Sequence, residues 1–316
     1  MTKYSIIFPG QGAQSVGMGQ DSHQASAQIQ EIYAKADELF GSSPSISEVS
    51  FNGPEETLAK TLYTQPAILT LSIALASQVK AAIQASKIAK PEFVAGHSLG
   101  EFSALYMADV LSLEDVLRLV IKRAQLMEAA PAGAMSAIIG MDESKLNEII
   151  AGINGASVAN YNSADQIVAT GTQEAMTELA KQVEEFATAN SVKARVIALN
   201  VGGAFHSPLM QAASNEFANL IDACEFKDAS IPVIQNINAQ ATTEANQIKT
   251  NLKQQMTGSV QWTKTCADLI SKNGEIWEIG PGKVLAGLVK KQDRRYPVKN
   301  IASITDLDSV LNPVVN

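Results

Sequence analysis

A serine in GHSLG, residues 96–100, is the first residue whose setting suggests chemistry. Glycines on both sides of Ser98 permit a sharp strand-to-helix turn, which raises the hydroxyl above the end of a sheet. The helix that begins there directs free backbone N–H groups at a developing oxyanion. The pattern predicts that Ser98 can be acylated, with an ordinary helix-capping serine as the alternative. It leaves open whether water or another acceptor removes the acyl group.

A nucleophilic serine needs a base, and the chain contains three histidines. His97 adjoins the serine, and adjacent side chains on a tight turn tend to diverge. His23 lies in a polar stretch that predicts the start of a surface helix. His206, in GAFHSPLM, has the small neighbours and the following proline of a loop at a sheet edge. A lone histidine is more often structural than catalytic, but elimination makes His206 the candidate base.

No acidic residue of a Ser-His-Asp triad is evident. In the chain order of α/β hydrolases this acid would lie between the serine and the histidine. The aspartates in that interval all lie in polar, helix-start or turn contexts: Asp109, Asp115, Asp142 and Asp165. We therefore expect a Ser–His dyad, in which a backbone carbonyl orients the imidazole without a charge.

Arg123 is the most informative charge in the sequence. At 100° per residue, the helix predicted over 113–129 has one apolar arc, formed by Leu113, Val116, Leu117, Val120, Ala124 and Met127. Arg123 falls inside this arc, where an unpaired charge would be very costly. Either an internal salt bridge neutralises it, or it binds the carboxylate of a substrate through two hydrogen bonds. In the second case the acyl group carries a free acid.

Two further segments have weaker signals. GQGAQSVG, residues 10–17, lacks the spacing of a dinucleotide fingerprint, so we expect close backbone approach to a ligand, with Gln11 offering an amide. Basic residues gather late in the chain, at Lys283, Lys290, Lys291, Arg294, Arg295 and Lys299. They predict a solvated face or a landing site for phosphates or an acidic partner.

Periodicity places these residues on an α/β framework. Strands are predicted at 4–8, 92–95, 231–236 and 276–279, and helices at about 24–40, 65–86, 98–107 and 113–129. Residues 131–199 have the order β-α-β-β-α-β of a ferredoxin-like module: strand 134–141, helix 142–153, hairpin strands 157–161 and 166–170, helix 173–188 and strand 193–199. We therefore predict an α/β-hydrolase-like large domain from residues 1–130 and 200–316, with 131–199 as a ferredoxin-like insertion. The C-terminal NPVVN is expected to fray.

Composition narrows the class of protein. The chain has 316 residues, of which 46% are hydrophobic and 18% charged, which is typical of a globular protein. A net charge of −8 argues against nucleic-acid binding, and no apolar run is long enough to span a membrane. Cys224 and Cys266 predict buried thiols in a reducing compartment rather than a disulfide or a zinc site. We expect a cytoplasmic monomer without metal or redox cofactor.

Taken together, the motifs resemble those of the malonyl-CoA:acyl carrier protein transacylase family of bacterial fatty-acid synthesis. The resemblance covers nearly the whole chain and includes the helix with Arg123 and Met127. The other matching segments, in order, are FPGQGAQSVGMG, TQPAILTLS, AGHSLGE, GAMSAIIG, ANYNSADQIVATG, GAFHSPLM, VQWT and EIGPGKVLAGL. The family implies a large α/β domain with a ferredoxin-like insertion, in agreement with the order of elements above.

The resemblance also implies roles for single residues. Ser98 would be the nucleophile and His206 its base, with the backbone carbonyl of Gln255 orienting the imidazole. Arg123 would bind the malonyl carboxylate. The oxyanion hole would consist of Gln11 and the N–H of Leu99, and Phe205 resembles the form that prefers malonyl over α-methylated groups.

The implied reaction is a ping-pong transfer of malonyl from malonyl-CoA to the phosphopantetheine thiol of acyl carrier protein, through a malonyl-serine. Ala164–Asp165, Gly202 and Ala124 depart from the usual family pattern, which bears on loop geometry and acyl preference. Three alternatives remain open: a stand-alone acyltransferase of a polyketide pathway, a serine thioesterase or esterase, and a non-enzymatic module that binds carrier proteins.

Overall fold

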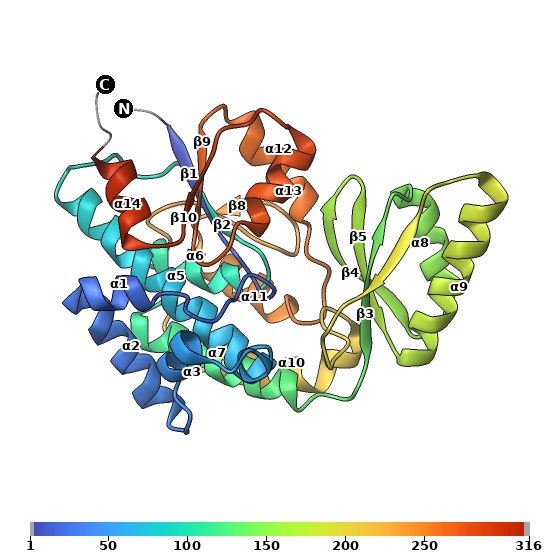
Figure 1. The fold of residues 1–316 in the computed structure, drawn as a ribbon, viewed down its shortest axis with the longest axis horizontal. Coiled ribbons are helices and arrows are strands. Elements are labelled where there is room, and N and C mark those ends of the chain that lie inside the picture. Colours follow the sequence, from blue (N-terminus) through green and yellow to red (C-terminus); the bar gives the residue numbers. More distant parts are fainter. Residues whose placement is uncertain (1–2, 313–316) are drawn as a thin grey trace.

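The computed structural model describes residues 3–312, which form two sheets with helices around them (Figure 1). The larger sheet contains β1 (Tyr4–Phe8), β2 (Val94–Gly96), β7 (Val233–Ile234), β8 (Ala241–Thr242), β9 (Glu275–Ile279) and β10 (Val298–Ile301). The smaller sheet contains β3 (Ala134–Ile139), β4 (Ala156–Ser163), β5 (Gln166–Gly171) and β6 (Arg195–Ala198). The C-terminal residues 313–316, most of the segment expected to fray, lie outside the described residues.

The larger sheet has the strand order β10-β9-β1-β2-β7-β8. Its neighbouring strands are parallel, except that β8 runs antiparallel to β7. β1 lies in the middle of the sheet and is buried along its whole length, as expected for a parallel strand covered on both faces. The C-terminal end of β2 runs into the GHSLG turn, so the sheet delivers this turn to its carboxyl edge.

Helices cover both faces of the larger sheet. They are α1 (Gln20–Ala25), α2 (Ala27–Phe40), α3 (Ile46–Asn52), α4 (Glu55–Leu58), α5 (Thr61–Gln84), α6 (Gly100–Met107), α7 (Leu113–Glu128), α10 (Gln211–Ala223), α11 (Ala245–Gln254), α12 (Trp262–Ser271), α13 (Val284–Gln292) and α14 (Ile304–Leu311). A short 3₁₀ helix, Pro208–Met210, precedes α10.

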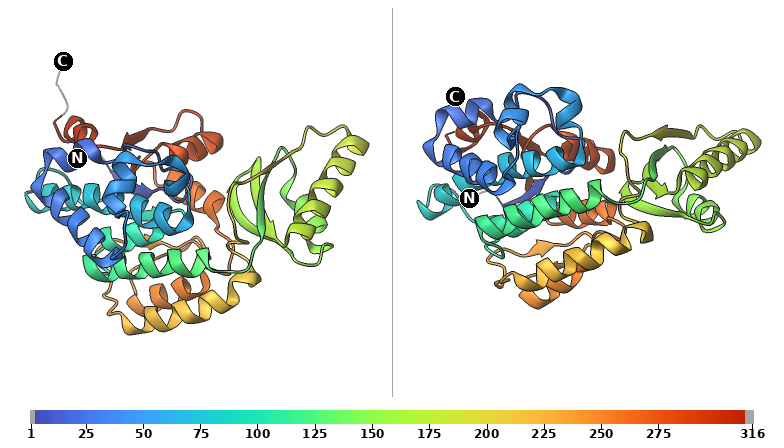
Figure 2. Two further views of the ribbon diagram at one scale, coloured as in Figure 1. Left: turned by 60° about the horizontal axis from the view of Figure 1, so that its bottom comes forward. Right: turned by 90° about the horizontal axis from the view of Figure 1, so that it is seen from below.

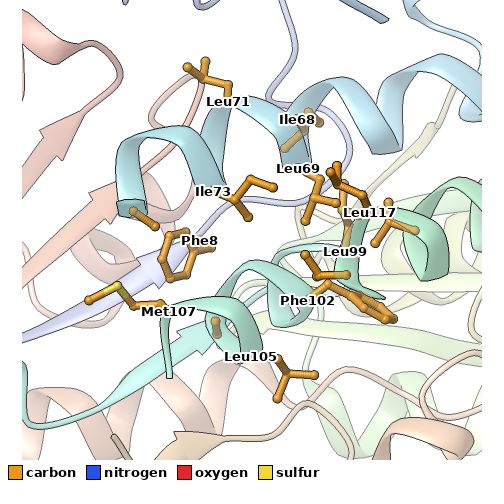
Figure 3. Close-up of a cluster of buried hydrophobic side chains, with 14 of the residues drawn as sticks. Phe8, Ile68, Leu69, Leu71, Ile73, Leu99, Phe102, Leu105, Met107 and Leu117 are labelled. Atoms are coloured by element: carbon orange, nitrogen blue, oxygen red, sulfur yellow. The ribbon is translucent and has the colours of Figure 1, made fainter. Parts of the chain in front are cut away.

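The alternation of side chains along β1 divides the core into two clusters. Ile6 and Phe8 point to the larger cluster with α5, α6 and α7, whereas Ile7 points to a smaller cluster with α12 and α13. Figure 3 shows Phe8 among side chains of α5 and α6 in the larger cluster. α5 is long and apolar enough to cross a membrane, but 78% of its most apolar window is buried inside the protein. The apolar character of α5 is therefore explained by its position in the core of the larger domain.

The smaller sheet has the order β4-β5-β3-β6 with antiparallel pairing, which is the ferredoxin-like arrangement. α8 (Glu143–Ala151) and α9 (Gln173–Asn190) pack on one face of it around Leu146 and Leu179. Figure 2 shows this unit projecting from one end of the larger domain. The predicted fold class is confirmed, whereas the boundaries 131 and 199 of the insertion stay a prediction.

A short parallel bridge ties the insertion to the larger domain. The Tyr161 N–H donates to the Val260 carbonyl at 2.9 Å, and the Val260 N–H donates to the Ala159 carbonyl at 2.8 Å. Two hydroxyls add to the bridge: Ser259 Oγ donates to the Val158 carbonyl at 2.6 Å, and Thr263 Oγ1 donates to the Tyr161 carbonyl at 3.0 Å. β4 is thereby held beside the segment that follows α11.

Some expectations were wrong in detail. The helix predicted at about 24–40 is two helices, because Ser26 adopts an extended conformation (φ −139°) and its side chain caps α2. The expected strand at 231–236 has only Val233 and Ile234 in strand conformation. Cys266 is buried as predicted, but Cys224 is only partly buried; both thiols are free.

Candidate active site

Ser98 lies on a tight elbow between β2 and α6, in a left-handed backbone conformation with φ 50°. The elbow requires its two glycines. A Cβ on Gly96 would overlap the backbone of Gly100, and a Cβ on Gly100 would overlap the carbonyl of Phe8. Asn236 holds the turn from the next strand, because its Oδ1 accepts from the Ser98 N–H and its Nδ2 donates to the Gly96 carbonyl, both at 2.6 Å.

The structure brings Ser98 and His206 together. Ser98 Oγ lies 2.7 Å from His206 Nε2, and the other ring nitrogen, Nδ1, lies 2.9 Å from the Gln255 carbonyl and 3.2 Å from that of Gly258. Carbonyl oxygens only accept, so Nδ1 must carry the proton in the neutral ring. Nε2 is therefore the unprotonated nitrogen that accepts the serine O–H.

Burial keeps the imidazole neutral. His206 is 5% exposed, and desolvation together with the nearby Arg123 charge lowers its pKa to about 3. A ring with this pKa is almost fully unprotonated at neutral pH, as a general base must be before it takes a proton. No carboxylate lies within salt-bridge distance of the ring among residues 3–312.

Arg123 reaches the serine from α7. Its side chain is 1% exposed, and NH1 donates to Gln65 Oε1 at 2.7 Å. NH2 donates to both Ser98 Oγ and Gln255 Oε1 at 3.1 Å, whereas Nε has no partner among the described residues. Burial lowers the pKa of Arg123 to about 10, so the group remains a cation at neutral pH.

The internal salt bridge that the sequence left open for Arg123 is not found within the described part of the chain. No carboxylate oxygen lies within 4.0 Å of the guanidinium there. Its hydrogen-bond partners are neutral amides and a hydroxyl, and its closest charge compensation is the more distant Glu101 carboxylate. The cation is held in place without being neutralised at close range, which leaves it able to bind an anion.

Ser98 and His206 line a cavity of about 100 Å³, together with other predicted site residues. Gln11, Leu99 and Phe205 line it together with Ser98, His206 and Arg123. The N–H of Leu99, at the start of α6, has no acceptor among the described residues. Met127, Leu199 and Val201 complete an apolar wall, so the cavity suits a short acyl group with one anionic end.

His97 also lines the cavity, but its ring contacts other residues than Ser98 and His206. Its Nε2 lies 2.8 Å from Asn162 Oδ1, and its ring packs edge-on against Trp262. Burial lowers the pKa of His97. The basic residues near the C-terminus do not line the cavity; Lys291 pairs with Asp165 of the insertion at 3.1 Å. No group of three or more His, Cys, Asp or Glu side chains that could hold a metal occurs in the described residues.

Several polar residues of the site were missed by the sequence analysis. Gln65 and Glu101 lie in apolar helical runs, and Asn236 follows the short apolar strand β7. A polar residue inside such a run is the signal that could have identified them, as it did for Arg123. Glu101 directly follows GHSLG but is not among the aspartates that were candidates for a triad acid.

Comparisons with known proteins agree with this geometry. The model of the acyl transferase domain family matches residues 5–305. The malonyl CoA-acyl carrier protein transacylase of Synechocystis sp. is 39% identical, over 98% of this chain and 100% of that protein. The crystal structure of an acyl carrier protein S-malonyltransferase from Vibrio cholerae is 34% identical, covers 98% of this chain and 100% of that one, and has a TM-score of 0.89.

A third similar structure is a malonyl-transacylase in complex with its acyl-carrier protein from a type II PKS. It is 31% identical, covers 98% of this chain and 99% of that chain, and has a TM-score of 0.88. Similarity of this extent, in sequence and in structure, establishes the family. The chain belongs to the malonyl CoA-acyl carrier protein transacylase family.

Proposed function

We propose that the protein transfers malonyl from malonyl-CoA to the phosphopantetheine thiol of acyl carrier protein, through a malonyl ester of Ser98. The observation that carries the proposal is the buried Arg123 guanidinium, which contacts Ser98 Oγ and has no carboxylate partner among residues 3–312. If an acyl group with a free carboxylate were bound to Ser98, the Arg123 cation would lie close enough to bind that carboxylate. The names of the relatives agree with this reaction.

In the first half-reaction, Ser98 Oγ attacks the thioester carbon as its proton passes to His206 Nε2. The oxyanion that forms is stabilised by the N–H of Leu99 and by Gln11, in the manner of an oxyanion hole. The C–S bond then breaks, and the imidazolium returns the proton to the departing CoA thiolate. The carbonyls of Gln255 and Gly258 keep Nδ1–H in place and stabilise the transient cation.

In the second half-reaction, His206 takes the proton of the carrier-protein thiol. The resulting thiolate attacks the malonyl ester carbon, the C–Oγ bond breaks, and Ser98 regains its proton from His206. The same groups serve both directions because each half-reaction is an acyl transfer between sulfur and oxygen. The reaction itself requires no metal or redox chemistry.

Acyl selectivity follows from the two ends of the cavity. Arg123 would bind the malonyl carboxylate with charge-assisted hydrogen bonds from Nε, which has no partner among the described residues, and from NH2, which would shift from Ser98 Oγ and Gln255 Oε1. Phe205 and His206 both line the cavity. The aromatic ring of Phe205 would limit the room for a methyl group on the α-carbon of the acyl group. We infer a preference for malonyl over both acetyl and methylmalonyl groups.

The first experiment is intact-mass spectrometry of the protein with malonyl-CoA or acetyl-CoA, before and after acyl carrier protein is added. Wild type should gain one malonyl group, located on Ser98 by peptide mapping, and lose it on addition of the carrier protein. Ser98→Ala should gain none. No adduct on Ser98, or an adduct lost to water as fast as to the thiol, would contradict the proposal and favour a thioesterase.

The selectivity role of Arg123 has its own variant. Arg123→Lys keeps the charge but loses the two-pronged geometry. Each charge-assisted hydrogen bond is worth about 1.5–3 kcal/mol, so malonyl loading should fall roughly 10- to 100-fold relative to acetyl loading. Equal losses for both acyl donors, or an unchanged ratio, would refute the carboxylate-binding role.

A second candidate is malonyl transfer to the carrier protein of a polyketide pathway. It is favoured by the similarity to the transacylase solved with a type II PKS carrier protein. Comparing transfer rates to a fatty-acid carrier protein and to a polyketide carrier protein separates the two. A cytoplasmic location and a monomeric state stay predictions, and light scattering of the purified protein tests the second.

A further inference from the structure

The proposed reaction leaves one buried carboxylate below the site without a role. Glu101 lies on the first turn of α6, three residues after Ser98, and is 1% exposed. It has no salt-bridge partner within 4.0 Å among residues 3–312, although a buried ionised carboxylate is costly unless hydrogen bonds satisfy it. The hydrogen-bond partners of Glu101 therefore indicate its role.

Three hydrogen-bond donors converge on Glu101. Gln255 Nε2 donates to Oε2 at 2.7 Å, the Asn236 backbone N–H donates to the same oxygen at 3.3 Å, and Gln235 Nε2 donates to Oε1 at 3.3 Å. These donors come from the end of β7 and the end of α11, two segments that share no backbone pairing with α6. The carboxylate therefore accepts hydrogen bonds from both of these segments.

Gln255 connects this carboxylate to the reacting groups. Its backbone carbonyl holds His206 Nδ1 at 2.9 Å, and its side-chain Oε1 accepts from Arg123 NH2 at 3.1 Å. Its Nε2, which reaches Glu101, also donates to the Ser98 carbonyl at 2.9 Å. One glutamine thus contacts the nucleophile's backbone, the base and the cation, and Glu101 is the anion that fixes this glutamine.

Asn236 connects the same carboxylate to the nucleophile elbow. Its N–H donates to Glu101, and its side chain bonds both the Ser98 N–H and the Gly96 carbonyl. A neutral side chain at position 101 could not accept from every donor, because a glutamine has an NH2 donor in place of one carboxylate oxygen and a protonated acid has one oxygen that carries a hydrogen. At least one of the converging groups would then be left unpaired in the interior.

We infer that Glu101 is a positioning residue, whose ionised carboxylate sets the geometry of Ser98, His206 and Arg123 through Gln255 and Asn236. The inference rests on the proposed function for the identity of the acyl donor, but the positioning of the Ser–His pair can be tested without malonyl-CoA. Glu101 never touches substrate in this role.

The same geometry makes the site sensitive to pH. Burial raises the pKa of Glu101 to about 7, against the opposing effect of its hydrogen bonds and of Arg123. Arg123 is the one charged side chain whose field acts on Glu101 among the described residues, and burial lowers the pKa of both histidines of the site, His206 and His97. Protonation of Glu101 would produce the same mismatch of donors as a glutamine.

The test compares Glu101→Gln with Glu278→Gln. Glu278 is an equally buried glutamate that accepts from the N–H groups of Leu285 and Ala286. None of these three residues lines the cavity, so Glu278 controls for the loss of a buried carboxylate. Two rates are measured between pH 5 and 8: labelling of Ser98 by a fluorophosphonate, which reports activation of the serine, and malonyl loading from malonyl-CoA. Circular dichroism and thermal unfolding establish that each variant is folded.

We expect Glu101→Gln to slow the labelling of Ser98 at pH 8 by about 10- to 100-fold. This is the loss of rate expected when a catalytic group is displaced by about 1 Å. Glu278→Gln should be labelled at the wild-type rate. The wild-type rate should fall as pH drops through about 7. Glu101→Gln should lack this acid limb, a difference that a purely structural role would not produce. If the variant does not fold, the wild-type profile is the test.

A Glu101→Gln protein that labels as fast as wild type, a variant that keeps the acid limb, or a flat wild-type profile would each overturn the inference. Normal fluorophosphonate labelling of wild type without malonyl loading would instead refute the proposed function alone. Wild type that is not labelled at Ser98 would overturn both.

Discussion

At the scale of the residue, the two partners of the proposed dyad both have left-handed backbones. Ser98 has φ 50° and His206 has φ 58°, a conformation that costs a non-glycine residue on the order of 1 kcal/mol or more. Hydrogen bonds from other segments hold both residues: Asn236 binds the Ser98 N–H, and two carbonyls accept from the His206 ring. The strain directs both side chains into one cavity.

The low pKa of His206 predicts how stability depends on pH. Its pKa is about 3 in the folded protein and near 6.5 in the unfolded chain, so between these values only the unfolded chain binds the proton. The free energy of unfolding should therefore fall as pH drops below about 6.5, by roughly 1.4 kcal/mol per pH unit from this group. His206→Gln removes the group and with it this part of the pH dependence.

Urea unfolding of wild type and His206→Gln at pH 7.5 and pH 5.0 measures the effect. All other titrating groups are present in both proteins, so the difference between the two pH dependences isolates the histidine. Parallel pH dependences would show that the imidazole is not held neutral in the folded state.

At the scale of the element, the nucleophile elbow depends on α6 starting in direct contact with β1. The backbone of Gly100 lies against the carbonyls of Phe8 and Pro9, so no side chain fits there. We expect Gly100→Ala to destabilise the protein by about 1–3 kcal/mol, as overpacking of a core does, and to reduce labelling of Ser98.

Gly287 in α13 is the matched control for this substitution. Nothing lies within 4 Å of a Cβ built on it, and a helical glycine costs about 0.5–1 kcal/mol relative to alanine. Gly287→Ala should therefore raise the thermal unfolding temperature, whereas Gly100→Ala should lower it. The same sign for both substitutions would disprove the close-packing explanation of the elbow.

Elements could be predicted from the sequence where their signals are local. The helix predicted at 113–129 is α7, Leu113–Glu128, because one of its faces is apolar; the structure adds a cap by Ser112. No helices were predicted between residues 200 and 316. In that part Ser303 caps α14, but α10, α11, α12 and α13 start without a side-chain cap, so the usual start signal is missing for these four helices. Packing against the sheet, rather than local sequence, determines where they begin.

At the scale of the whole molecule, the insertion and the site share one segment. Residues 258–263 bond β4 of the insertion and also provide the Gly258 carbonyl to His206. Ser259→Ala removes the hydroxyl that donates to the Val158 carbonyl, at an expected cost of about 1 kcal/mol. We expect faster amide hydrogen exchange at Tyr161 and Val260, because these N–H groups form the bridge beside it.

Ser309→Ala is the control for Ser259→Ala. The Ser309 hydroxyl bonds within α14, to the Thr305 carbonyl, and lies outside the bridge. Exchange at Tyr161 and Val260 should be the same in Ser309→Ala and wild type. Unchanged exchange in Ser259→Ala would mean that the backbone bridge alone holds the insertion.

The sequence by itself determined the candidates for chemistry. The serine has a local motif, the histidine follows by elimination among three, and the arginine stands out on an apolar helix face. The signals for the serine and the arginine each lie within one element, where spacing and periodicity reveal them directly, whereas the histidine follows from a comparison over the whole chain.

Only the tertiary structure decided what surrounds these candidates. It showed that Arg123 has amide partners rather than a salt bridge within the described residues, that two carbonyls face His206 Nδ1, and that Glu101 lies at the centre of the buried polar network. Gln255 is 157 residues from Ser98, and Asn236 is 138 residues from it. Hydrogen bonds between segments so distant in sequence depend on how the helices pack on the sheet, and no local pattern encodes that packing.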